Sequence, residues 1–160
     1  MAFKIIIDIP TQTLQVMHGE QVQKTYLISS GKNGVGERHG SEQTPRGVHY
    51  IRAKIGAAAP ANAVFVGRRS TGEIYHPDLR AAFPDRDWIL TRIFWLCGCE
   101  PGKNRGGDVD TMRRYIYIHG TPDDVEMGVP GSRGCIRMRN KDIIELFDQI
   151  PAGVSVNIVA

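Results

Sequence analysis

Short runs of alternating apolar and polar residues recur along this chain, and glycine or proline separates most of them. Alternation places successive side chains on opposite faces of an extended strand, so each run predicts a half-buried β-strand. The 18 glycines and 9 prolines among the 160 residues favour many tight turns over long helices. The sequence therefore predicts a mainly β protein. We expect strands over residues 4–9, 13–17, 22–29, 48–53, 115–119, 135–138 and 154–159.

One helix is predicted near the C-terminus. Asn140 is a favourable N-cap, and Ile143, Phe147 and Ile150 recur at helical spacing after it. Pro151 then ends the pattern.

The middle of the chain, residues 52–112, shows a weaker pattern. No internal repeat and no linker composition interrupts the sequence, so we expect one domain over residues 1–160, with 52–112 as an elaboration or lid within it. Within it we expect short strands at 64–66 and 73–75, a strand or helix at 88–96, and a loop at 100–110.

Composition excludes several classes of protein. Hydrophobic residues are 41% and charged residues 23%, which is typical of a globular domain. Twenty Lys and Arg against 17 Asp and Glu are too balanced and too scattered for a nucleic-acid-binding surface. No apolar run reaches the ~18 residues of a transmembrane helix, so no membrane span is expected.

The three cysteines are too few and odd in number for a disulfide framework, which favours a reducing compartment. The first residues lack the ~7–15-residue apolar core of a secretory signal. We therefore expect a cytoplasmic protein, and a periplasmic one if a leader has been removed. The oligomeric state is not indicated.

Cys135 lies in an unusual setting for a structural cysteine, because Arg133, Gly134 and Arg137 surround it in the sequence. Nearby cations favour the thiolate, which is the nucleophilic form of cysteine. Gly134 allows a substrate to approach the backbone. The amides here could donate to a developing oxyanion, and one such donor contributes on the order of 10²–10³ in rate.

His119 ends a run of strict alternation and is the candidate base. On a strand, Tyr117 and His119 share one face, and Cys135 and Arg137 share one side of the next run. From the residues alone, a structural role for Cys135 and His119 is the alternative.

A zinc site is a further alternative, because Cys97, Cys99, Cys135 and His119 make a Cys₃His set by count. Structural zinc sites usually space paired cysteines as C-x₂₋₄-C, and Cys97 and Cys99 are separated by one residue. We expect no metal and no cofactor.

The chain resembles the L,D-transpeptidase catalytic domain, the YkuD family of bacterial cell-wall enzymes. The resemblance rests on His119-Gly120, followed sixteen residues after the histidine by the cysteine of the run from Ser132 to Met138, and on the turn at residues 44–47. It covers about residues 3–159 and implies a β-sandwich of mixed sheets with one helix near the C-terminus and an active site under a flap.

The resemblance also implies roles for individual residues. Cys135 would be the nucleophile and His119 the general base, with its ring oriented by a backbone carbonyl. The amides of Gly134 and Cys135 would form the oxyanion hole, and Arg137 would hold the loop or meet a substrate carboxylate. The residues expected to line the substrate site are Arg137, Tyr117, Ser132, Arg133 and Gly120. Many family members carry His where this chain has Arg133, which argues against an essential second imidazole.

Family enzymes attack the bond between an L-centred diamino acid and the terminal D-Ala of a peptidoglycan tetrapeptide, forming a thioester. We expect hydrolysis of that thioester, an L,D-carboxypeptidase activity on free muropeptides during recycling. The alternatives are a periplasmic L,D-transpeptidase that crosslinks peptidoglycan stems, and a non-catalytic module that binds wall peptides.

Overall fold

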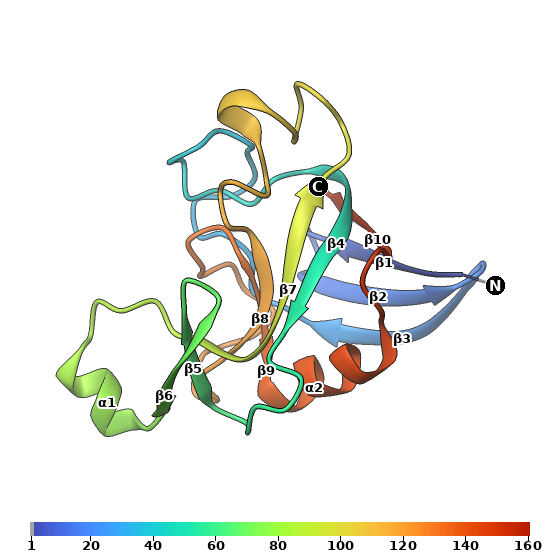
Figure 1. Cartoon of the computed structure of the whole chain (residues 1–160). Coiled ribbons are helices and arrows are strands. Elements are labelled where there is room, and N and C mark those ends of the chain that lie inside the picture. Colours follow the sequence, from blue (N-terminus) through green and yellow to red (C-terminus); the bar gives the residue numbers. More distant parts are fainter. Residues whose placement is uncertain (1) are drawn as a thin grey trace.

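The computed structural model describes residues 2–160, which form one mixed, ten-stranded β-sheet with two α-helices (Figure 1). The strands are β1 (Phe3–Asp8), β2 (Thr13–His18), β3 (Gln21–Leu27), β4 (Gly47–Ile55), β5 (Ala63–Val66), β6 (Arg69–Ile74), β7 (Ile89–Gly98), β8 (Tyr117–Thr121), β9 (Ile136–Arg139) and β10 (Ser155–Val159). The helices are α1 (Pro77–Ala82) and α2 (Asn140–Gln149), with a 3₁₀ turn at Gly107–Val109.

The sheet runs in the order β3-β2-β1-β10-β4-β7-β5-β6, and β8 joins it by pairing with both β7 and β9. The pairs β1–β10 and β8–β9 are parallel, and the remaining pairs are antiparallel. The sheet curls until its ends meet, because Ser29, just after β3, exchanges two backbone hydrogen bonds with Arg137 of β9, at 2.9 and 3.0 Å. This contact holds the segment before β9 against residues 29–32.

The alternating runs form strands for the predicted reason. In the β1–β2 pair, Ile5 lies opposite Val16 and Ile7 opposite Leu14, and all four side chains are buried. The intervening residues of both strands are more exposed. The same alternation buries one face of β9 and β10. The predicted mainly β class with mixed pairing is confirmed.

The main core lies between the curled sheet and α2, and it draws on β1, β2, β3, β4, β7, β8, β9 and β10. Helix α2 buries Ile143, Leu146 and Phe147 against it, and the rings of Phe147 and Phe94 lie 5.4 Å apart. The predicted N-cap is wrong. Arg139 occupies that position in extended backbone without a side-chain cap, and Asn140 is the first helical residue.

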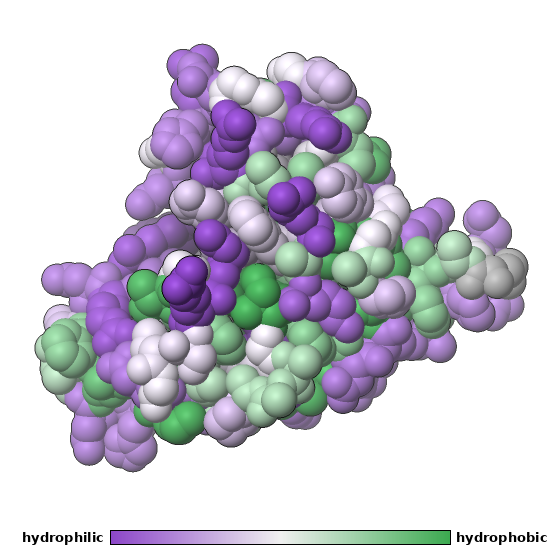
Figure 2. Space-filling view, viewed as in Figure 1, coloured by the Kyte–Doolittle hydropathy of each residue, from purple (hydrophilic) through white to green (hydrophobic). Residues whose placement is uncertain are grey.

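The middle of the chain differs from a simple lid. The range 52–112 contains β7, which pairs with β4, β5 and β8 and is buried almost throughout. Within this range, β5, β6 and α1 project from the main body at the lower left of Figure 1, and the loop after β7 projects at the top. Apolar residues are exposed there, including Val66, Ile74 and Phe83, which are half-exposed (Figure 2). Within residues 2–160, no helix has the length and apolarity needed to cross a membrane.

Candidate active site

The parallel pairing of β8 with β9 brings Cys135 to His119. His119 lies opposite Arg137 and Ile118 opposite Ile136, and Cys135 is the residue before β9. Paired residues share a face and successive residues alternate, so the side chains of Cys135 and His119 lie diagonally on one face. Ile118 and Ile136 fill the core on the other face. The side chains predicted to act together are therefore neighbours on the sheet.

The Cys135 thiol lies in a polar turn of the backbone before β8. The Tyr117 amide donates to Sγ at 3.3 Å, and the thiol donates to the Tyr115 carbonyl at 3.4 Å. Tyr115 was predicted to lie on the strand, but its φ of 56° places it in a left-handed turn.

Burial raises the pKa of Cys135 to about 12, and the Tyr117 hydrogen bond, Arg137 and Arg114 offset only part of this effect. The direction of this pKa shift is opposite to the one that the neighbouring arginines in the sequence led us to expect. Its sequence neighbour Arg133 points elsewhere and donates to the Asp85 carbonyl at 2.8 Å. The resting thiol is therefore neutral and needs a base.

The imidazole ring of His119 is neutral, and its Nδ1 atom is used in a hydrogen bond. The side chain is 1% exposed, and Nδ1 lies 2.6 Å from the Gly120 carbonyl, the kind of contact expected from the sequence. A carbonyl only accepts, so Nδ1 carries the proton and Nε2 is left as the acceptor. Nε2 is buried and has no hydrogen-bond partner among the described residues. Burial lowers the pKa of His119, which keeps the ring neutral at pH 7.

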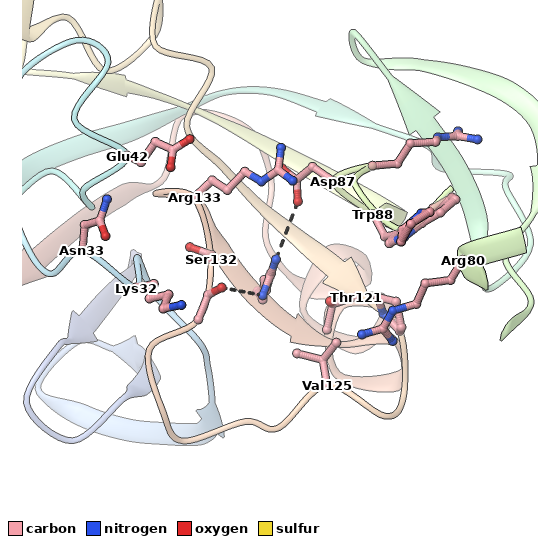
Figure 3. A pocket seen from close by; sticks show the side chains of 15 residues that line it. Lys32, Asn33, Glu42, Arg80, Asp87, Trp88, Thr121, Val125, Ser132 and Arg133 are labelled. Atoms are coloured by element: carbon pink, nitrogen blue, oxygen red, sulfur yellow. Dashed lines mark hydrogen bonds and ion pairs between the residues drawn. The ribbon is translucent and has the colours of Figure 1, made fainter. Parts of the chain in front are cut away.

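Arg137 holds the loop rather than facing open solvent. Its Nη1 donates to the Gly131 carbonyl at 2.9 Å, and Nη2 lies 3.6 Å from Asp87 Oδ1. A dashed line from Asp87 in Figure 3 marks this ion pair. Asp87 also opposes the lowering of the His119 pKa. Sequence reasoning missed Asp87, because it lies in the weakly patterned middle of the chain.

Ser132 stabilises the loop at residues 131–135, which we call the nucleophile loop, through hydrogen bonds within that loop. Its hydroxyl donates to the Cys135 carbonyl at 2.6 Å and accepts from the Gly134 amide at 3.1 Å. Of the two predicted oxyanion donors, the Gly134 amide is thus already occupied in this conformation. The Cys135 amide has no hydrogen-bond partner among residues 2–160. The Cys135 amide is therefore the available donor, and Ser132 acts through the loop.

The fold itself requires glycine at position 134. Its φ is 123°, and a Cβ atom there would lie 3.0 Å from the Gln43 carbonyl oxygen. Thr44 donates from Oγ1 to the Gly134 carbonyl at 2.9 Å and accepts from the Gly31 amide at 2.8 Å. The predicted turn at residues 44–47 therefore ties two loops to the nucleophile.

Gly120 is buried, and it lines neither of the two pockets that flank the site. A Cβ atom at Gly120 would collide with the Asn140 side chain and the Leu90 carbonyl. Its role is to pack closely and to present its carbonyl to His119.

Two pockets flank the site and share Asp87 and Arg133. One, of about 440 Å³, is lined by Cys135 and by Tyr117, as predicted, and also by Arg68. The other, of about 380 Å³, is lined by Arg137 and Ser132 and by several further charged residues (Figure 3). These further charged residues are Lys32, Glu42, Arg80 and Arg86.

Cys97 and Cys99 lie apart from this centre. Cys97 is buried at the end of β7, and Cys99 is exposed just beyond it. Within the part of the chain that the structure describes, no three His, Cys, Asp or Glu side chains are grouped to hold a metal ion.

Known proteins match this chain over nearly its whole length. Residues 2–158 match the YkuD family, described as the L,D-transpeptidase catalytic domain. The chain is 46% identical over 156 residues to the putative L,D-transpeptidase YkuD of Bacillus subtilis. This alignment covers 98% of this chain and 65% of that relative. The protein of the same description from Bacillus licheniformis is 44% identical over 156 residues, with the same coverage.

Solved structures show the same fold at low sequence identity. An L,D-transpeptidase from Mycobacterium smegmatis aligns with a TM-score of 0.58 at 17% identity, over 99% of this chain and 58% of that one. One from Xylanimonas cellulosilytica aligns with a TM-score of 0.57 at 18% identity, over 99% of this chain and 60% of that one. The chain therefore belongs to the YkuD family of L,D-transpeptidase catalytic domains.

Proposed function

We propose that this chain transfers an acyl group from a peptidoglycan stem peptide through a thioester on Cys135. One observation carries the proposal: a neutral imidazole with an unpartnered Nε2 shares a sheet face with a neutral thiol that lines a pocket. Covalent catalysis needs a nucleophile and an oriented base, and in this conformation the thiol donates to the Tyr115 carbonyl, so it turns towards Nε2 before its proton is transferred. Relatives described as putative L,D-transpeptidases support the substrate class.

The proton follows a defined route in this proposal. His119 Nε2 takes the thiol proton as Sγ attacks the carbonyl carbon of the L-centred residue, and the Cys135 amide donates to the resulting oxyanion. The Gly120 carbonyl stabilises the imidazolium through Nδ1–H. Collapse breaks the C–N bond, and His119 returns the proton to the leaving D-residue amine. The thioester and a neutral imidazole remain.

The acceptor distinguishes two activities. Water as the acceptor gives hydrolysis and net L,D-carboxypeptidase action, which is the outcome expected from the sequence. Hydrolysis requires only that water reaches the thioester. An amine of a second stem gives a crosslink, and the second pocket beside Arg133 favours this alternative by offering room for another chain. Both activities share the first half-reaction.

The test begins with that half-reaction. Wild-type protein is mixed with tetrapeptide and quenched, and intact mass should show a tripeptidyl adduct and one equivalent of released D-Ala. Cys135→Ala should give neither, and Cys99→Ala, at an exposed thiol remote from the site, should behave as wild type. If the wild type binds peptide but neither acylates nor releases D-Ala, the chain is a binding module instead.

Adding an amine-bearing stem then separates the acceptors. Tripeptide as the main product indicates hydrolysis, and a crosslinked dimer indicates transpeptidation. A cytoplasmic location belongs with hydrolysis of free muropeptides in this proposal, and cell fractionation measures it directly.

A further inference from the structure

Arg68 lies at the tip of the β5–β6 hairpin and lines the same pocket as Cys135. β5 ends at Val66 and β6 begins at Arg69, so Gly67 and Arg68 form a two-residue turn. Their φ angles are 55° and 64°, the left-handed pattern of a type I′ turn, which favours glycine or asparagine. Arginine is an unfavourable residue for this backbone, and such positions concentrate at functional sites.

Two aromatic rings and a hydroxyl group hold the guanidinium of Arg68. The group lies 4.4 Å from the centre of the Trp95 ring and 4.9 Å from that of Tyr115, and Nη1 donates to the Tyr117 hydroxyl at 2.9 Å. The bond to Tyr117 uses one of the five N–H groups of the guanidinium, and the others are left to bind a ligand. A planar edge with several donors matches a carboxylate.

The other two arginines that line this pocket lack the aromatic contacts that hold Arg68. Arg133 donates to the Asp85 carbonyl, and Arg114 donates to four acceptors around residues 36–43. Arg68 forms no ion pair with any carboxylate in residues 2–160, and its one hydrogen bond there is the one to Tyr117. A preorganised cation without a counter-ion therefore faces the pocket that holds the nucleophile.

We propose that Arg68 binds the terminal α-carboxylate of the stem peptide and so selects substrates with a free C-terminal D-residue. The inference rests on the proposed function, which supplies a peptide cleaved one residue from its end. In that peptide only the amide nitrogen and one Cα separate the scissile carbonyl from the carboxylate carbon. A cation lining the same pocket as Cys135 is therefore suitably placed for it.

Binding measurements test this inference without turnover. Calorimetry on Cys135→Ala protein compares tetrapeptide ending in a free acid with the same peptide ending in a primary amide. The acid should bind tighter by roughly 10–100-fold, the range of a charge-assisted hydrogen bond. Adding Arg68→Gln should bring the acid to the affinity of the amide and leave the amide unchanged. Arg69→Gln, an exposed arginine one residue along the hairpin, is the matched control and should keep the preference.

Three results would overturn the role of Arg68: equal affinity for acid and amide, an equal loss for both peptides in the Arg68→Gln protein, or no binding of either. The proposed function fails in a different way. In that case the Cys135→Ala protein prefers the acid through Arg68, yet the wild type forms no thioester with it.

Discussion

Replacing Thr44 with valine tests whether the turn at residues 44–47 holds the nucleophile loop. Valine keeps the shape of the side chain and removes Oγ1, which donates to the Gly134 carbonyl at 2.9 Å and accepts from the Gly31 amide at 2.8 Å. Thr44 is fully buried, so water cannot replace either bond. Each unsatisfied buried group costs about 1–3 kcal/mol, and Thr44→Val should lower the free energy of unfolding by roughly 2–6 kcal/mol.

The same change should slow acylation of Cys135. Without Thr44, the peptide between Gly134 and Cys135 loses a tether, and the Cys135 amide is less well aligned with the oxyanion. Complete loss of one oxyanion donor costs on the order of 10²–10³ in rate, which sets the upper limit for Thr44→Val. Urea denaturation measures the stability, and single-turnover acylation by a carbapenem, followed by intact mass below the unfolding range, measures the rate.

Thr44→Ser is the control, because it keeps the hydroxyl and removes one methyl group, worth about 1 kcal/mol. It should acylate close to the wild-type rate. If folded Thr44→Val acylates as fast as wild type, the turn does not position the loop. If its stability also matches wild type, the two hydrogen bonds contribute nothing and the reasoning fails entirely.

Three further predictions follow from the buried groups. The kcat/KM should be flat between about pH 7 and 9 and fall only below pH 6.5, because the pKa of His119 is lowered and that of Cys135 is raised; a tenfold rise per pH unit over that range would instead show attack by a free thiolate. Burial lowers the pKa of His49 from 6.5 to about 4. As the pH falls from 6.5 to 4, His49 is therefore protonated in the unfolded chain but not in the folded chain, and the free energy of unfolding decreases. That difference is worth up to about 3 kcal/mol, and His49→Gln should flatten this part of the curve of unfolding free energy against pH; an unchanged slope would refute it. Gly120→Ala should destabilise the protein by about 1–3 kcal/mol in thermal denaturation, whereas Gly131→Ala, where a Cβ atom meets only ordinary contacts, should be tolerated; equal melting temperatures would contradict the packing argument.

Alternation predicted the strands that bury one face, and it placed the right side chains on each. It left β7 open between strand and helix, because nearly all of that strand is buried, Thr91 and Arg92 included, so its polar residues do not mark an exposed face. It also missed α1, whose six residues are too few to show a helical period. The expected N-cap role of Asn140 failed because its amide is used elsewhere: it accepts from Thr91 and donates to Asn62 and Asp123.

The pairing of Cys135 with His119 could be predicted, because the alternating runs that form β8 and β9 and the sequence motif contain both residues. The ionisation of Cys135 could not, since the pKa depends on what surrounds the sulfur in space. Arg133 is two residues from Cys135 in the sequence, yet its guanidinium donates a hydrogen bond to the backbone carbonyl of Asp85. Asp87 and Arg68 come from the middle of the chain, where no periodicity or motif indicates which side chains face the site.

The raised pKa of the Cys135 thiol weakens the inference from the number of cysteines to the cellular compartment. An odd number of thiols favours a reducing compartment because exposed thiolates oxidise readily. Here desolvation raises the pKa of Cys135 to about 12, although its side chain is partly exposed, and Cys97 is buried. Cys99 is exposed, and its pKa is also raised, first of all by burial. Because the thiolate is the form that oxidises readily, raised thiol pKa values weaken the link between an odd number of cysteines and a reducing compartment.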